Sequence, residues 1–279
     1  MIARVLRFVR FSHTIFALPF ALGSMLFAAH GWPSWEVIGL ILAAMVFART
    51  AAMGFNRLAD WEIDRRNPRT ADRHRLLPRS AAVALVAGSS AAFVAATWWI
   101  NPLCFWLSPV ALAIVFFYSF TKRFTSYSHF FLGLALSVSP VGAWLAVRGE
   151  FAFPPLVLAL AVLFWVAGFD IIYATQDHAF DRAEGLRSLV VRLGIPRSLL
   201  WAQRLHWLMA AVLVIFGWLV AAGPAFYVGL GMIAAALIYE HRSVGNLDVA
   251  AINRAFFGSN AFVGAVFLAA SWCDQVLLR

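Results

Sequence analysis

The chain alternates between long apolar runs and short polar connections. A helix needs about 20 apolar residues to cross a bilayer. Nine runs approach this length, and they lie near residues 13–30, 36–55, 81–100, 103–120, 129–147, 152–173, 205–222, 224–240 and 255–273. Pro102, Pro154-Pro155 and Gly223-Pro224 mark three connections where a helix cannot continue. The pattern therefore predicts an all-α membrane bundle of nine transmembrane helices.

Positive charge is confined almost entirely to alternate connections. Of the 22 lysines and arginines, only Arg148 and Arg279 fall outside the N-terminal segment and the ends of the even-numbered runs. The others are Arg4, Arg7, Arg10, Arg49, Arg57, Arg65, Arg66, Arg69, Arg73, Arg75, Arg79, Lys122, Arg123, Arg182, Arg187, Arg192, Arg197, Arg204, Arg242 and Arg254. Basic loops stay in the cytoplasm. The N-terminus is predicted inside, the C-terminus outside, and the long loops at the cytoplasmic face are where function is expected.

Composition agrees with a membrane protein. The 279 residues are 63% hydrophobic and 13% charged, whereas soluble domains average roughly 45–50% apolar and about 25% charged. The arginines that give the net charge of +9 lie mostly between spans. Membrane topology and attraction to anionic headgroups therefore explain the charge better than nucleic-acid binding does. The first apolar run is too long for a signal-peptide core and is expected to be retained. Cys104 and Cys273 lack partners at metal-binding spacing and are expected to be inert.

The first chemical motif ends the second apolar run. Asn56, Asp60 and Asp64 are spaced four apart, which places them on one face of a helix. Two like charges at this spacing repel each other, more strongly where water is scarce. A divalent cation is the natural compensation.

The second motif ends the sixth run. Asp170, Tyr173, Asp177 and Asp181 are spaced 3, 4 and 4, again one helical face. Five of the eight aspartates in the chain belong to these two motifs. Ion pairing at solvated helix ends is the ordinary alternative, but it does not explain the repeated spacing. The repetition of the acidic motif suggests one domain over residues 1–279 with two pseudo-repeated halves, about 1–125 and 126–240, plus a ninth helix.

Two carboxylate clusters suit magnesium, which favours oxygen ligands and retains waters and substrate phosphates. A diphosphate bound to two such ions becomes a good leaving group. The candidate diphosphate ligands are the cytoplasmic-loop cations Arg69, Lys122, Arg123 and Arg187, together with Asn56. The membrane offers room for a long isoprenoid tail.

These motifs resemble the two signatures of the UbiA superfamily of intramembrane prenyltransferases. The matching residues are Asn56-Arg57-xx-Asp60-xxx-Asp64-xxxx-Arg69-Thr70 and Asp170-xx-Tyr173-xxx-Asp177-xxx-Asp181, with Tyr118-xxx-Lys122-Arg123 as the short basic motif. Arg187 stands where many members have lysine. The resemblance covers essentially the whole chain.

The resemblance implies magnesium-dependent transfer of a polyprenyl group from its diphosphate to an acceptor, often aromatic. Asn56, Asp60 and Asp64 would bind one magnesium, and Asp177 and Asp181 the other. Asp170 and Tyr173 would shape the reacting centre. Catalysis is thus assigned to the six motif residues Asp60, Asp64, Asp170, Tyr173, Asp177 and Asp181.

The N-terminal segment Arg10-Phe11-Ser12-His13-Thr14 resembles the branch that makes respiratory quinones. That branch acts on 4-hydroxybenzoate, or on a 1,4-dihydroxy-6-naphthoate-type acceptor in the futalosine route to menaquinone, so ubiquinone and menaquinone pathways both stay open. Arg10 and His13 are candidates for the aromatic carboxylate, although an interfacial role suits His13 equally. Arg49 either pairs with an acid of the first cluster or contacts the acceptor. An enzyme of the cell inner membrane is expected.

Three other classes of membrane protein share some of these features. A transporter would also carry intramembrane acids, but its site is expected near the midplane rather than at helix ends. A CDP-alcohol phosphatidyltransferase would show a DGxxAR core, which is absent. A cation-π-lined terpenoid cyclase would need a cage of rings, whereas the 26 Phe and 12 Trp are better explained by packing and interfacial belts.

Overall fold

The computed structural model describes residues 2–10, 14–244, 252 and 255–278. His13, Arg254 and Arg279, which entered the predictions above, lie outside these ranges. The described residues contain helices and turns and no strand, as predicted. They form two compact units. The N-terminal unit comprises Met1–Thr14 and Ser34–Phe120, and the C-terminal unit comprises Ile15–Pro33 and Thr121–Arg279.

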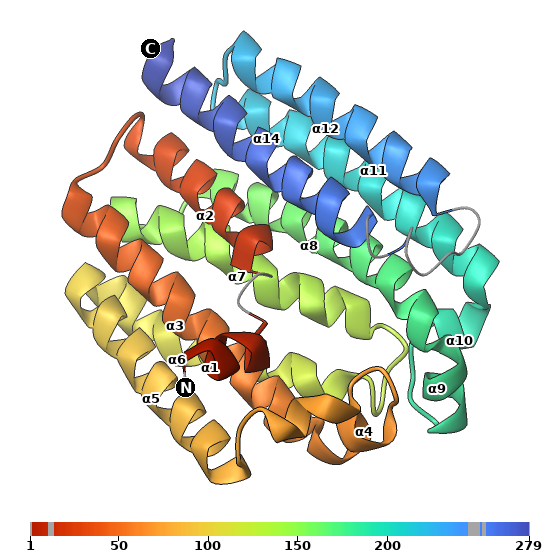
Figure 1. Cartoon of the computed structure of the whole chain (residues 1–279). Helices are drawn as coiled ribbons and strands as arrows, with labels where there is room; N and C mark the ends of the chain where they lie inside the picture. Colours follow the sequence, from red (N-terminus) through yellow and green to blue (C-terminus); the bar gives the residue numbers. More distant parts are fainter. Residues whose placement is uncertain (1, 11–13, 245–251, 253–254, 279) are drawn as a thin grey trace. The chain divides into compact units, whose positions relative to one another are not determined.

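The N-terminal unit is built on α3 (Trp35–Ala59), which runs along α5 (Arg79–Ile100), as Figure 1 shows in orange and yellow. Ser34 begins α3 by accepting a hydrogen bond from the Val37 amide through its hydroxyl oxygen. Phe55 of α3 stacks on Phe116 of α6 (Pro102–Thr121), with ring centroids 4.4 Å apart. The shorter elements are α1 (Ile2–Phe8), α4 (Trp61–Arg66) and the 3₁₀ turn η2 (Ala71–Arg75).

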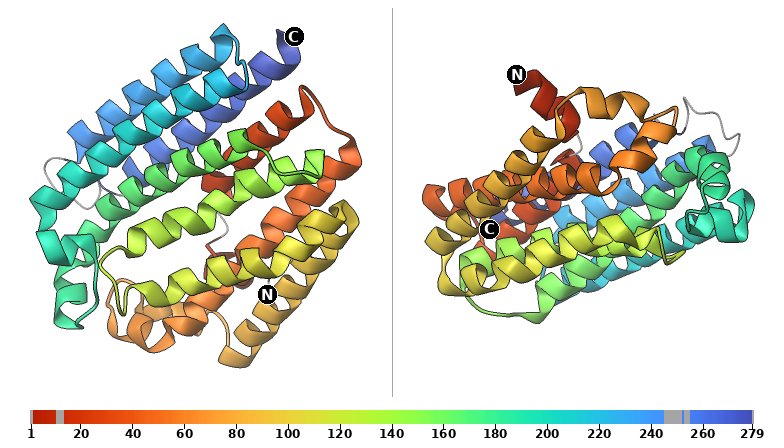
Figure 2. Two further views of the ribbon diagram at one scale, coloured as in Figure 1. Left: turned by 180° about the vertical axis from the view of Figure 1, so that it is seen from behind. Right: turned by 90° about the horizontal axis from the view of Figure 1, so that it is seen from below.

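The C-terminal unit surrounds α8 (Phe153–Ala174), which packs between α7 (Ser128–Arg148) and α11 (Ile195–Leu219). Figures 1 and 2 show α11, α12 (Pro224–Ser243) and α14 (Asn260–Trp272) side by side. The unbroken aromatic core includes Phe20 of α2 (Thr14–Ala29), Trp165 and Phe267, all fully buried. The remaining elements are η3 (Thr175–Asp177), α9 (His178–Ala183), α10 (Leu189–Leu193), η4 (Ala255–Ser259) and η5 (Cys273–Leu277).

Seven helical segments of the described chain are long and apolar enough to cross a membrane. They are Trp35–Ala59, Arg79–Ile100, Pro102–Thr121, Ser128–Arg148, Phe153–Ala183, Ile195–Leu219 and Phe257–Leu277. The predicted runs near 13–30 and 224–240 correspond to α2 and α12, which are not among the seven.

One predicted boundary was wrong by ten residues. The seventh run was expected at 205–222, but α11 begins at Ile195, with Pro196 in its first turn. Proline is favoured in the first turn because the amide it lacks has no partner within the helix there. The first turns of α11 also carry Arg197, Ser198 and Arg204, so a hydropathy pattern does not detect them although the backbone is helical.

The contact between α7 and α8 depends on a missing side chain. A Cβ atom built on Gly133 would lie 2.5 Å from the Leu163 carbonyl oxygen. Small residues let membrane helices approach this closely, and van der Waals packing is a main source of their association. Gly142 on the same helix has no atom within 4 Å of such a Cβ.

We therefore expect Gly133→Ala to destabilise the protein by about 1–3 kcal/mol, since the two backbones must separate to admit the methyl group. Gly142→Ala is the matched control, and it should be neutral or slightly stabilising because alanine favours helix more than glycine does. Thermal unfolding of the purified variants in detergent measures the difference. Equal unfolding temperatures for the two variants would contradict the close contact.

Candidate functional site

The first acidic motif lies where α3 gives way to α4. The predicted helical face through Asn56, Asp60 and Asp64 is interrupted, because Asp60 both ends α3 and precedes α4, with φ −95° and ψ 13°. The periodicity survives the interruption. The Asp60 amide donates to the Asn56 carbonyl at 2.9 Å, and the Asp64 amide donates to the Asp60 carbonyl at 2.7 Å. Four-residue hydrogen bonding on both sides of the interruption keeps the helical register.

Asp60 is buried at the end of the span. It is 4% exposed, and its Oδ2 lies 3.4 Å from the Nδ2 of Asn56, a second buried residue. The same Asn56 nitrogen lies 3.4 Å from the hydroxyl of Ser119 on α6. Asn56 is thus held between Asp60 and α6, and the sequence had suggested no role for Ser119.

Asp64 makes two ion pairs within the N-terminal unit. Its Oδ2 is 3.3 Å from Nη1 of Arg57, and its Oδ1 is 3.1 Å from Nη1 of Arg73. The Thr70 hydroxyl donates to the Asp64 carbonyl oxygen at 3.0 Å, which ties the following loop to α4. Arg57 precedes Asp64 by seven residues, two helical turns on one face, so its pairing could have been anticipated. Arg73 is nine residues further on, and no local periodicity points to it.

Cations outnumber acids around Asp64. Arg49, Arg57 and Arg10 are close enough to one another for repulsion, and Tyr118 interacts electrostatically with Arg49. Burial, with repulsion from Arg57 and Arg10 in the same direction, lowers the pKa of Arg73 to about 9, against the opposing pull of Asp64. A bound anion would relieve this excess of positive charge.

Arg69 and Arg49, two arginines predicted to contact substrates, differ in their exposure to solvent. Arg69 is exposed, and its backbone amide donates to Oδ1 of Asn67 at 2.9 Å, in the turn that follows α4. Arg49 is half-buried on α3, and its Nε has no hydrogen-bond partner among the described residues. Its Nε is therefore an unused donor, next to Tyr118 and Arg57.

The second acidic motif belongs to the C-terminal unit and is likewise interrupted. The expected single helical face is wrong in detail, because α8 ends at Ala174 and the 3₁₀ turn Thr175–Asp177 leads into α9. A 3₁₀ turn has about 3.0 residues per turn rather than 3.6, so it rotates later side chains away from the α-helical stripe. Asp170, Tyr173, Asp177 and Asp181 are all half-buried.

Asp170 has a partner that the sequence did not suggest. Nδ1 of His129, in the first turn of α7, lies 2.6 Å from Oδ2 of Asp170. Because a carboxylate accepts, Nδ1 carries the proton in this pair. The His129 ring is buried, and its Nε2 has no hydrogen-bond partner among the described residues. The two residues are 41 positions apart, so no spacing pattern could find the pair.

The predicted cations of the C-terminal unit do come together. The Arg187 amide donates to the Lys122 carbonyl at 2.8 Å, and Nη1 of Arg187 donates to the Phe124 carbonyl at 2.7 Å. Arg123 is the next residue after Lys122, and both Arg123 and Arg187 are exposed. The loop after α6 and the loop after α9 are therefore joined, which gathers Lys122, Arg123 and Arg187 in one basic group.

The donor set suits magnesium only in part. Among the described residues, no three His, Cys, Asp or Glu side chains are grouped so that they could hold a metal ion alone. Magnesium usually takes one or two carboxylates and completes its shell with waters and substrate phosphates. Asp60 with Asn56, and Asp177 with Asp181, offer hard oxygen donors of that kind. The residues present therefore fit an ion that arrives with its diphosphate.

Comparison with known proteins gives a consistent result. The model of the UbiA prenyltransferase family matches residues 17–266. A 4-hydroxybenzoate octaprenyltransferase from Aromatoleum aromaticum is 32% identical over 257 residues, covering 89% of this chain and 85% of the relative. One from Marinobacter nauticus is 29% identical, covering 95% and 92%.

Solved structures share the fold. The apo structure of a UbiA homolog from Aeropyrum pernix K1 has a TM-score of 0.86 at 31% identity and covers 95% of this chain and 98% of its own. A UbiA homolog from Archaeoglobus fulgidus bound to GPP and Mg²⁺ has a TM-score of 0.76 at 21% identity, covering 98% and 99%. Because the family model spans most of the residues and the relatives match nearly end to end, the chain belongs to the UbiA prenyltransferase family and is a multi-pass membrane transferase of prenyl groups.

Proposed function

We propose that this enzyme transfers a polyprenyl group from polyprenyl diphosphate to 4-hydroxybenzoate or a closely similar aromatic acid, in respiratory quinone biosynthesis. The observation that carries the proposal is the cation-rich group around buried Asp60 and Asp64, because it offers both metal-binding oxygens and positive charge for a diphosphate. The relatives named 4-hydroxybenzoate octaprenyltransferase support the acceptor, and the homolog bound to GPP and Mg²⁺ supports the donor.

Two magnesium ions are proposed to accompany the diphosphate. Asn56, Asp60 and Asp64 hold one, and Asp177 and Asp181 hold the other. For Asp64 this requires that Arg57 or Arg73 give up its present contact, and the diphosphate oxygens are suitable new partners for a released guanidinium. Magnesium held there would neutralise the charge that develops on the leaving diphosphate.

The protein side chains perform the remaining tasks. Arg69 and the joined basic group of Lys122, Arg123 and Arg187 bind the diphosphate and orient it. The allylic C1–O bond breaks, the diphosphate leaves, and the aromatic carbon forms a bond to C1. Loss of the ring proton restores the aromatic system. Arg10 and Arg49 are the proposed partners of the acceptor carboxylate, since both are cations close to the first motif.

His129 is proposed to position Asp170. A carboxylate that accepts a proton from the prenylated ring must be held in one orientation, and the 2.6 Å contact with Nδ1 does this. Tyr173, three residues on and packed against the buried core, is proposed to shape the same region.

The proposed location is the cell inner membrane, with nine spans, the N-terminus in the cytoplasm and the active site facing it. The cation distribution of the loops supports this orientation. The nine-span topology counts α2 and α12 among the membrane-spanning helices. Membership in a transferase family removes the reason to consider a transporter.

The direct test uses purified protein with a polyprenyl diphosphate, magnesium and a panel containing 4-hydroxybenzoate and 1,4-dihydroxy-6-naphthoate. We expect prenylated 4-hydroxybenzoate and stoichiometric diphosphate, and we expect EDTA to abolish both until magnesium is restored. Product from the naphthoate alone would reassign the acceptor to the menaquinone route. Absence of product and of diphosphate release across the whole panel would refute the proposal.

Asp60→Asn and Asp177→Asn should each lower kcat at least about 100-fold, because a charged ligand opposite the leaving group is lost while shape is kept. Asp72→Asn is the matched control. Asp72 is an exposed acid on η2 that pairs with Arg75, and its loss should leave kcat unchanged. Steady-state kinetics with the thermal stability of each variant measure the outcome. Near-normal turnover in either motif variant would rule out the metal assignment.

His129→Ala should lower kcat about 10- to 100-fold with little change in KM for either substrate, because the orientation of Asp170 is lost and binding groups remain. His129→Gln retains an amide donor and should recover part of the rate. A change confined to stability, with kcat intact, would show that the pair is only structural.

A further inference from the structure

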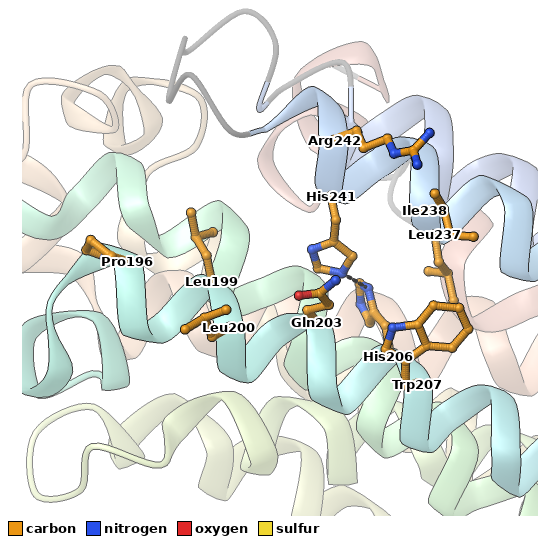
Figure 3. A pocket seen from close by; sticks show the side chains of 10 residues that line it. All are labelled: Pro196, Leu199, Leu200, Gln203, His206, Trp207, Leu237, Ile238, His241 and Arg242. Atoms are coloured by element: carbon orange, nitrogen blue, oxygen red, sulfur yellow. Dashed lines mark hydrogen bonds between the residues drawn. The ribbon is translucent and has the colours of Figure 1, made fainter.

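A groove of about 420 Å³ lies between α11 and α12 within the C-terminal unit, and no residue of either acidic motif lines it. Pockets of this size accommodate small ligands or parts of larger ones. Four polar residues line it, and Figure 3 shows the two imidazoles and the Gln203 amide gathered at its centre. They are Gln203 and His206 from α11 and His241 and Arg242 from α12.

The walls on either side of this polar centre are apolar and face outward. Leu200 is 54% exposed and Trp207 is 48% exposed, on α11, and Ile238 on α12 is 38% exposed. In a membrane helix, such residues meet lipid. The groove therefore opens sideways to hydrocarbon while its centre offers hydrogen-bond donors, which is the polarity pattern of a lipid with a polar head.

The His206 imidazole is held against the backbone of α8. Nε2 of His206 lies 3.3 Å from the Trp165 carbonyl oxygen of α8, and a Cβ on Gly168 would lie 2.4 Å from the same imidazole. The ring therefore packs directly on the α8 backbone. A carbonyl only accepts, so Nε2 of His206 carries a proton and donates.

The proton on Nε2 of His206 fixes the direction of the hydrogen bond between His206 and His241. Nδ1 of His206 lies 2.9 Å from Nε2 of His241, as the dashed line in Figure 3 marks. With Nε2 of His206 protonated, Nδ1 accepts when that ring is neutral, and His241 donates through Nε2. The second nitrogen of His241 is then an acceptor, because a neutral imidazole carries only one proton.

A buried acid lies behind the imidazole pair. Glu240 is fully buried, its two carboxyl oxygens have no hydrogen-bond partner among the described residues, and Oε2 lies 3.6 Å from Nδ1 of His206. Glu240 is not among the residues that line the groove. Glu240 therefore adds no acidic side chain to the lining of the groove.

The charges that face the groove have one sign. Arg242 joins His241 at the C-terminal end of α12, and no acid is among the described residues that line the groove. Basic pockets between transmembrane helices are sites for anionic lipid head groups. In the topology proposed above, this end of α12 lies at the cytoplasmic surface, but lipid binding itself does not depend on that orientation.

We propose that the groove between α11 and α12 binds an anionic phospholipid, with the phosphate accepting from Arg242 and Gln203 and an acyl chain lying along Leu200, Trp207 and Ile238. The site is separate from the proposed catalytic groups. It adds a specific lipid contact that fastens two neighbouring helices of the bundle.

The test titrates the detergent-solubilised full chain with phosphatidylglycerol or phosphatidylcholine of identical acyl chains, followed by native mass spectrometry. Phosphatidylglycerol should bind at least about tenfold more tightly, as expected for its uncompensated phosphate. Arg242→Gln should weaken phosphatidylglycerol binding about fivefold, and the double variant Arg242→Gln/Gln203→Ala should weaken it further. Arg204→Gln is the matched control, because this exposed arginine of α11 lies over the Trp201 ring and does not line the groove.

Three results would overturn the proposal. Equal affinity for the two lipids would remove the anionic preference, and an equal loss in the Arg204 and Arg242 variants would remove the site. Displacement of phosphatidylglycerol by millimolar inorganic phosphate or glycerol 3-phosphate would show that the groove takes a soluble phosphate instead. The experiment measures lipid binding alone, so its outcome does not depend on whether the protein transfers prenyl groups.

Discussion

The structure of the N-terminal unit depends on keeping charge on carboxylates that are almost out of water. A carboxylate in the bilayer centre costs about 2.5–3.5 kcal/mol, and less near an interface. Asp64 offsets this cost through Arg57 and Arg73, whereas Asp60 has Asn56 beside it. The surrounding cations exceed the acids, so the group is complete only with an added anion. A substrate diphosphate, arriving with magnesium, would supply this anion.

Interrupted helices serve this arrangement in both units. The break at Asp60 and the 3₁₀ turn at Thr175–Asp177 each come at the polar end of an apolar span. A helix that stops frees backbone groups, which is tolerable where water or polar partners are near. Each acidic motif thus lies at the polar end of an apolar span, as the proposed binding of a diphosphate requires.

Two buried histidines of the C-terminal unit show opposite uses of the same side chain. Nδ1 of His129 donates a hydrogen bond to Asp170 within the predicted catalytic motif, and Nδ1 of His206 accepts one from His241 at the groove between α11 and α12. Each is buried, so each needs a defined partner, because an unsatisfied polar group in the interior is costly. One interaction orders a proposed reacting group and the other orders a proposed lipid contact.

The sequence alone determined the helical class, most of the spans, the two acidic motifs and the family, because apolar periodicity and i, i+4 spacing are properties of consecutive residues. It also indicated that Lys122, Arg123 and Arg187 share a function. Only the tertiary structure decided that Arg73 pairs with Asp64, that His129 pairs with Asp170, and that His206 meets His241. It also decided where the helices break and that α11 begins at Ile195. These features arise from side chains meeting across packed helices and from local backbone geometry, which the spacing of residues along one chain does not encode.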